Sequence, residues 1–177
     1  MIEKILEKIT DRLPVRRIDG FKNEPYLERA YLFSLFGFTA YIHRFVASDP
    51  DRGMHDHPWG IAFSFVLSGY YIEKYLHKDQ IKHRIINRFN WVPGHRFHRV
   101  IKPKELQKPV WTLFVHGPRT KSWGFASMVS TEQNTTIKDF NYLIFKEYTE
   151  KNKKGWHKTA CKGVFVKRYR RDLIQHG

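Results

Sequence analysis

The sequence of 177 residues holds a single cysteine, Cys161, so an internal disulfide framework is excluded. It also lacks any run of about 18 apolar residues, the length that a membrane-spanning helix needs. Acidic residues are scarce, with 17 Asp and Glu against 32 Lys and Arg, and the formal net charge is +15. The start, MIEKILEKIT, does not show the basic and then apolar pattern of a secretory signal. We therefore expect a cytoplasmic protein without a membrane segment.

The excess positive charge is uneven along the chain. Residues 150–177 contain nine Lys or Arg and only two acidic side chains. A field of this kind attracts anions in general, so small anionic substrates and nucleic acids are both candidate partners. The C-terminal segment GWHKTACKGVFVKRYRRDL also interleaves aromatic and cationic residues. This pattern is typical of a surface for single-stranded nucleic acid, and equally of a docked basic strand and helix.

The apolar pattern predicts an all-β protein with one helix. Residues 2–13 place apolar side chains at helical spacing, which indicates a short amphipathic helix that caps the domain. The aromatic run over residues 31–45 predicts two strands, or one strand bent at Gly37. A hairpin turn is expected at Ser68-Gly69. Further strands are expected at residues 61–67, 70–76, 84–92, 96–101 and 110–116.

Short strands at this spacing favour a sandwich or barrel, and the length suits one domain. We expect an N-terminal helix and lead-in over residues 1–30 and a β-barrel over residues 31–129. Residues 130–177 are expected to form a loop, centred on STEQNTTIKD, and a basic extension packed on the same domain. A homodimer is an open alternative to a monomer.

Histidine gives the main chemical signal, since eight of the ten histidines lie between residues 43 and 116. In GMHDHPW, His55 and His57 are two residues apart, so in an extended segment both imidazoles point to one side and Asp56 to the other. One divalent ion can bridge such a pair. A third ligand from a distant strand would complete a facial set with open positions.

The third ligand is expected in the segment VPGHRFHRV, where two histidines are three residues apart. His95 directly follows the Pro93-Gly94 turn, and we expect it to be exposed. His98 lies 41 residues after His57 and is the preferred ligand.

The order of these features resembles the cupin superfamily, whose first motif carries His-x-His and then a Gly, and whose second carries a Pro-x-Gly turn before a third histidine. His55, His57, Gly69 and His98 match that pattern. The stretch over residues 41–125 is also similar to a small uncharacterised cupin-like family of bacterial and phage genomes. The resemblance implies a single jelly-roll barrel (double-stranded β-helix) that binds one divalent metal ion. Fe(II) is favoured, with Zn, Mn and Ni as alternatives.

One departure from the cupin pattern concerns the acidic ligand, because Ala62 stands where the family's glutamate is expected. With a two-residue hairpin loop, Leu67 would pair with Tyr70 and Ala62 with Tyr75, which would place Glu73 near the vacant position. Glu73 is therefore a candidate fourth ligand. The alternatives are a three-histidine site and a solvent-facing Glu73.

The resemblance implies a metal-dependent enzyme acting on a small anionic or polar substrate. Oxygenase chemistry is the first expectation and isomerase or epimerase chemistry the second. Arg119, in HGPRTKSWGF, is a candidate for binding a substrate carboxylate or phosphate, and Tyr75 is a second candidate substrate contact. The rival from another class is a non-catalytic module that binds a small ligand or nucleic acid.

Overall fold

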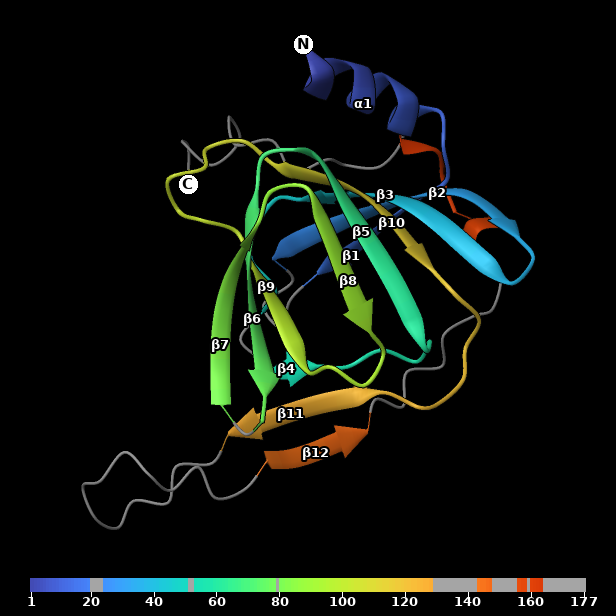
Figure 1. Cartoon of the computed structure of the whole chain (residues 1–177). Coiled ribbons are helices and arrows are strands. Elements are labelled where there is room, and N and C mark those ends of the chain that lie inside the picture. Colours follow the sequence, from blue (N-terminus) through green and yellow to red (C-terminus); the bar gives the residue numbers. More distant parts are fainter. Residues whose placement is uncertain are drawn as a thin grey trace.

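The computed structural model describes residues 1–19, 24–50, 53–78, 80–128, 143–147, 156–158 and 160–163. Across these residues the chain forms two six-stranded antiparallel sheets, with a helix at one end of the molecule and β11 and β12 at the other (Figure 1). The core between the sheets takes buried side chains from both of them. Leu27, Phe45 and Val110 come from the first sheet, and Tyr71, Ile86 and Val100 from the second. The predicted all-β, cupin-type jelly roll is confirmed.

The first sheet has the strand order β1-β2-β3-β10-β5-β8. Its strands are β1 (Val15–Asp19), β2 (Pro25–Leu35), β3 (Phe38–Phe45), β10 (Val110–His116), β5 (Ile61–Ser68) and β8 (Phe89–Pro93). The second sheet has the order β12-β11-β4-β9-β6-β7. Its strands are β12 (Leu143–Glu147), β11 (Gly124–Met128), β4 (Met54–His55), β9 (His98–Ile101), β6 (Tyr71–His77) and β7 (Gln80–Ile86).

The predicted hairpin at Ser68-Gly69 is wrong. β5 and β6 belong to different sheets, so this dipeptide is a corner at which the chain passes between them. Gly69 has φ of +80°, a left-handed conformation that suits glycine. Ala62 consequently pairs with Val92 and His116, and not with Tyr75. The hairpin in this region is instead formed by β6 and β7.

Two other strand boundaries differ from the expectation. The run predicted over residues 84–92 divides into β7 and β8, because the chain returns to the first sheet at residues 87–88. Sheet structure also starts before residue 31, at β1. The aromatic run over residues 31–45 forms two strands, since β2 and β3 pair closely around the turn at Phe36-Gly37.

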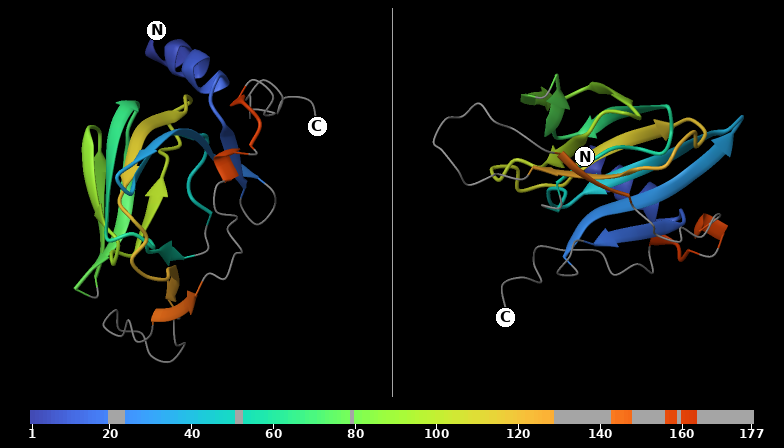
Figure 2. Two further views of the ribbon diagram at one scale, coloured as in Figure 1. Left: turned by 90° about the vertical axis from the view of Figure 1, so that its right-hand side faces the viewer. Right: turned by 90° about the horizontal axis from the view of Figure 1, so that it is seen from below.

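The N-terminal helix, α1 (Ile2–Asp11), covers the outer face of the first sheet (Figure 2). Leu6 packs there with Ala30, Ile42 and Trp111. The helix ends soon after Asp11, close to Pro14, whose ring disfavours helical conformation in the preceding residue. Because one face of the sheet is closed by the helix and the other by the second sheet, side chains of β2, β3 and β10 alternate between two buried environments.

Part of the C-terminal extension packs on the same unit. The backbone N–H of Val15 donates to the carbonyl of Cys161, and Gly163 donates to Leu13. The short 3-10 turn η1 (Trp156–Lys158) places the ring of His157 on Tyr31, with centroids 3.9 Å apart. The predicted loop at residues 130–139 and most of the basic extension lie outside the described residues. No helix in the described ranges has the length and apolar character that crossing a lipid bilayer requires.

Candidate metal centre

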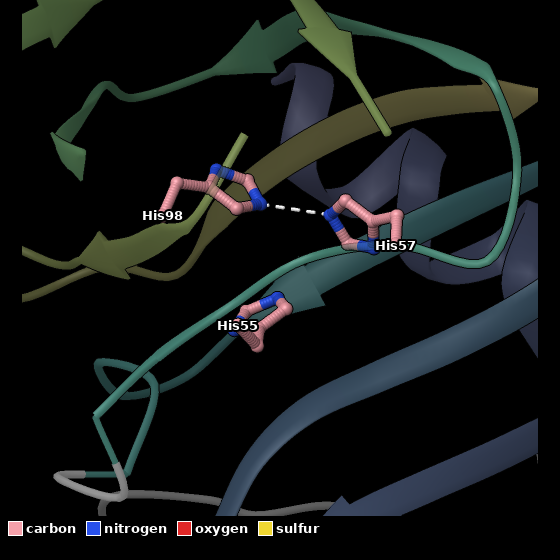
Figure 3. A group of neighbouring side chains, drawn as sticks. All are labelled: His55, His57 and His98. Atoms are coloured by element: carbon pink, nitrogen blue, oxygen red, sulfur yellow. Dashed lines mark hydrogen bonds between the residues drawn. The ribbon is translucent and has the colours of Figure 1, made fainter. Parts of the chain in front are cut away.

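Three histidines converge inside the barrel from two segments that are distant in sequence. His55 ends the short strand β4, where its register partner is His98, the first residue of β9 (Figure 3). His57 follows in the loop after β4 and faces both rings. The ligand nitrogens of the three imidazoles all lie within 4.8 Å of one another.

The spacing of the imidazoles suits a single ion. Nε2 of His57 lies 2.8 Å from Nε2 of His98 (Figure 3). Two imidazole nitrogens that each sit about 2.1 Å from one ion are about 3 Å apart, so only a small movement would admit a metal. His55 contributes a third nitrogen at the edge of this pair. This donor set fits a divalent transition ion, since imidazole is a ligand for Zn, Fe, Cu and Ni.

Glu73 fixes the orientation of His98. Its Oε1 accepts a hydrogen bond from Nδ1 of His98 at 2.8 Å, and its Oε2 accepts one from Nε of Arg84 at 2.6 Å. Burial alone would raise the pKa of Glu73, but the hydrogen bonds and charges of His98 and Arg84 lower that pKa to about 2. With the proton of His98 held at Nδ1, the lone pair of its Nε2 points at the cluster.

Backbone contacts hold the His55–His57 segment in place. The N–H of His57 donates to the carbonyl of Gly94 at 3.0 Å, and Gly94 donates to Gly60. A Cβ at Gly94 would lie 1.8 Å from the carbonyl oxygen of Trp59, so no other residue fits there. The Pro93-Gly94 turn is thus needed for close approach of two backbones.

Asp56, between the two histidines, points away from the cluster as the alternation predicts. Its Oδ1 accepts a hydrogen bond from the backbone N–H of Gly124 at 2.8 Å, and its Oδ2 contacts the ammonium of Lys121. Asp56 is buried, and these contacts tie the His-x-His segment to β11. Asp49, before this segment, is also buried and accepts from the N–H of Val100.

Burial keeps His57 in the uncharged form that binds metals. Desolvation of His57, followed by the nearby His98 and His55, lowers its pKa well below 6.5. At neutral pH His57 is therefore uncharged, with a nitrogen lone pair available. Trp59 stacks on its ring with centroids 4.9 Å apart. Trp123 lies near His55, at 6.4 Å between centroids.

Of the other residues selected from the sequence, Tyr75 of β6 lies next to the cluster, as the register partner of His98. Arg119 is exposed and forms an isolated bridge with Trp59. Tyr75 is half-buried, with the guanidinium groups of Arg84 and Arg96 about 5 Å from its ring centroid. His95 is exposed at its turn, as expected.

One inward-facing cation was missed at the level of sequence. Arg29 of β2 donates from Nε to Nε2 of His43 at 3.0 Å, and both residues belong to the inner face of the first sheet. A signal for this was present, because Arg29 alternates with Leu27 and Tyr31 and so shares their face. In a chain with 32 Lys and Arg, that signal is easily taken for a solvated residue.

The fold and the histidine cluster together define an all-β, cupin-like barrel with a candidate metal site. No family model matches the sequence, and no curated protein matches it. Among solved structures, the chain is similar to Fe(II)-HppE with the alternative substrate (S)-1-HPP, with a TM-score of 0.50 and 19% identity over 60% of this chain and 57% of that one.

Two further structures have lower scores. Hydroxypropylphosphonic acid epoxidase from S. wedmorenis gives a TM-score of 0.48, with 19% identity over 60% of this chain and 56% of that chain. A protein from Ralstonia eutropha JMP134, provisionally described as a mannose-6-phosphate isomerase, gives 0.44, with 19% identity over 52% of this chain and 84% of that one. The chain spans little more than half the length of the epoxidase chains. At this identity the likeness shows the fold alone.

Proposed function

We propose that this chain is a metal-dependent cupin enzyme in which His55, His57 and His98 bind one divalent ion, with Fe(II) as the favoured metal. The convergence of their ligand nitrogens within 4.8 Å carries the proposal. Three protein ligands leave coordination positions open, and Fe(II) in such a site supplies oxygenase chemistry on small molecules. The Fe(II) of the HppE neighbour is in line with this choice.

Glu73 acts in this proposal as a positioning residue. Both of its oxygens are engaged, one by His98 and one by Arg84, and it has no exposed surface. A carboxylate on the outer nitrogen of a ligand histidine fixes the tautomer and raises the basicity of the ligand. The proposed site is thus a three-histidine site supported by a carboxylate.

Metal stoichiometry is the direct test. Protein stripped with a chelator and reloaded under anaerobic conditions is expected to hold about one equivalent of Fe(II), by elemental analysis of desalted samples. His57→Ala and His98→Ala are expected to lose this binding. His95→Ala is the matched control, since His95 lies in the same segment but is exposed. Wild-type protein that retains no Fe(II), Mn(II), Ni(II) or Zn(II) would remove the proposal.

A conservative change at Glu73 tests its supporting role. Glu73→Gln is expected to weaken metal affinity about 10- to 100-fold while leaving one site per chain. Unchanged affinity would show that Glu73 has no such role, and complete loss of the site would indicate a ligand. Oxygenase chemistry is checked separately, by oxygen uptake of Fe(II)-loaded protein with small phosphonates and carboxylates. His98→Ala is the blank for that assay.

A further inference from the structure

Arg29 places a positive charge on the inner side of the barrel. Two residues to either side of it along β2, Leu27 belongs to the core between the sheets and Tyr31 packs against the inner aromatic cluster. Alternation along the strand puts Arg29 on the same face. Its hydrogen bond to His43 on β3 confirms that direction.

Aromatic contacts connect this arginine with the histidine cluster. His43 stacks on Phe114, with ring centroids 4.8 Å apart and planes 17° from parallel. The Phe114 ring in turn lies 6.4 Å from the ring of His57. The pKa of His57 is lowered mainly by burial, then by His98 and His55, and the charge of Arg29 also contributes. The guanidinium and the metal ligands therefore share one interior.

Among the described residues no carboxylate forms an ion pair with Arg29, although the charge of Asp49 acts to raise the pKa of Arg29. Its one hydrogen bond there uses a single N–H of the five that a guanidinium carries, and Tyr41 lies under the group at 5.2 Å. Desolvation by burial lowers the pKa of Arg29, but an arginine stays protonated in a protein. By contrast, the buried Arg44 on the other face of the sheet contacts Glu28 at 3.0 Å. Arg29 is half-buried, and a desolvated cation without an ion-pair partner is costly, so an anionic ligand would reduce that cost.

Two more polar groups of the interior lack partners among the described residues. They are Oγ1 of Thr112 and Nε1 of Trp59, and both atoms are buried. Thr112 is the register partner of His43 on β10. Trp59 stacks on both His57 and His116, so it lies between the cluster and the sheet. An indole N–H can only donate, and a hydroxyl can, so these atoms suit a ligand that offers acceptor oxygens.

We propose that Arg29 binds the oxyanion group of a small organic anion inside the barrel, with the rest of the ligand directed toward the three histidines. This inference rests on the proposed function only in one respect, namely that the end of the ligand away from Arg29 reaches a metal ion at the three histidines. The chemistry that the site would recognise is a phosphonate or carboxylate on a short carbon chain, because bidentate charged hydrogen bonds from a guanidinium suit both. The ligand's oxygens would also satisfy Trp59 and Thr112.

Calorimetric titration with ethylphosphonate, propionate and 1-propanol tests the proposal. Wild-type protein is expected to bind one or both anions and not the neutral alcohol, and their relative affinities tell a phosphonate site from a carboxylate site. Arg29→Met is expected to weaken anion binding about 10- to 100-fold, since a charge-assisted contact is lost. Arg29→Lys keeps the positive charge but loses the paired N–H groups of the guanidinium, and its affinity for the anion is expected to lie between those of wild type and Arg29→Met.

Exposed arginines provide the controls. Arg88→Met removes a charge at the corner between β7 and β8, and Arg119→Met removes the rim arginine selected from the sequence. Arg88→Met is expected to bind ethylphosphonate within about twofold of wild type, because solvated charges contribute little. Arg119→Met instead tests the arginine that the sequence offers as a substrate contact. Wild-type affinity in Arg29→Met, or a loss in Arg119→Met that exceeds the loss in Arg29→Met, would overturn the assignment.

An NMR measurement on unaltered protein guards against misfolding of the variants. Ethylphosphonate is expected to shift the indole N–H resonance of Trp59, identified by its absence in Trp59→Phe. The exposed indole of Trp91 is expected to stay in place. A titration that moves Trp91 and leaves Trp59 unshifted contradicts binding inside the barrel.

Metal-free and metal-loaded protein are titrated in parallel, so that failure of this inference is distinguished from failure of the proposed function. Anion binding that needs Arg29 in metal-free protein supports the site whatever the outcome of the metal analysis. If the protein binds metal normally but neither form binds an anion, the Arg29 site is contradicted and the proposed metal centre is not.

Discussion

Two neighbouring cross-strand pairs of β2 and β3 each contain an arginine, and the two arginines have different partners. On the outer face, Arg44 pairs with Glu28 at 3.0 Å beneath α1, and both side chains are nearly inaccessible. On the inner face, one residue along each strand, Arg29 pairs with the imidazole of His43. Among the described residues, the outer arginine has a carboxylate in an ion pair and the inner arginine does not.

This difference separates a charge that the fold requires from one that is available to a ligand. A buried ion pair contributes little net stability, but it becomes very costly when one partner is removed. In the outer pair the charge of Arg44 is matched by Glu28, and the ring of Trp111 lies 5.6 Å from the guanidinium, although Nε of Arg44 and Nε1 of Trp111 have no hydrogen-bond partner among the described residues. The inner pair leaves Arg29 without an ion-pair partner among the described residues, two aromatic contacts away from His57. The predictions below test this division, from the largest expected effect to the smallest.

Breaking the outer pair is expected to have the largest effect. Glu28→Ala leaves Arg44 buried and unpaired, so the free energy of unfolding is expected to fall by about 3 to 5 kcal/mol. Urea unfolding followed by circular dichroism measures this change. Glu24→Ala, an exposed position just before β2, is the control. A loss below about 1 kcal/mol would mean that the outer pair is not needed.

Acid is expected to act on the inner pair. Burial, and then the charges of Arg29 and His116, lower the pKa of His43 well below 6.5. The unfolded chain takes up a proton at His43 below pH 6.5 while the folded chain does not, so stability is present above that pH and is lost as the pH falls. The loss amounts to at most about 1.4 kcal/mol per pH unit.

The variant His43→Gln isolates this contribution, because glutamine can accept from Arg29 without titrating. Between pH 7 and pH 5, the free energy of unfolding of His43→Gln is expected to fall less steeply than that of wild type. The other histidines are present in both proteins, so their contributions to the pH dependence cancel in the comparison. Equal slopes would contradict the prediction, because they would mean that His43 takes up its proton over this pH range as readily in the folded chain as in the unfolded chain.

Removing the charge of Arg29 is not expected to lower the free energy of unfolding. Without ligand, Arg29→Met should raise the free energy of unfolding or leave it unchanged within about 1 kcal/mol, since a half-buried cation with no ion-pair partner among the described residues is replaced by an apolar side chain. The same urea measurement applies. A fall of several kcal/mol in the free energy of unfolding would show that the fold needs Arg29, as it is expected to need the pair of Arg44 and Glu28.

The smallest effect is expected at the barrel rim. Arg119 is exposed, so Arg119→Ala should change the free energy of unfolding by no more than about 0.5 kcal/mol. A larger loss would show that the bridge between Arg119 and Trp59 supports the cluster.

The all-β jelly roll could be predicted from the sequence, because strand patterns and the order of the histidine motifs are local features. The convergence of His55, His57 and His98 is seen in the structure, while their binding of an ion stays a prediction. The Ser68-Gly69 hairpin was wrong for a physical reason. The same dipeptide serves a turn within one sheet and a corner between two sheets, and only long-range pairing distinguishes them.

Sheet assignment also explains what sequence reasoning missed about Glu73 and Arg29. Glu73 reaches His98 because β6 and β9 are neighbours, whereas the expected hairpin placed it beside β5. Arg29 could be placed on the inner face by alternation with Leu27 and Tyr31. Its lack of a carboxylate partner among the described residues depends on tertiary contacts that no local pattern encodes.

The pairing of His55 with His98 has a consequence for how the chain folds. These residues meet only after a loop of some forty residues has closed, and β4 contributes only two residues to the sheet. An ion that binds the closed loop and not the open chain would stabilise the native state by about 2.7 kcal/mol at a concentration one hundred times its dissociation constant. Metal supply would then set the fraction of the protein that is folded, in addition to its chemistry.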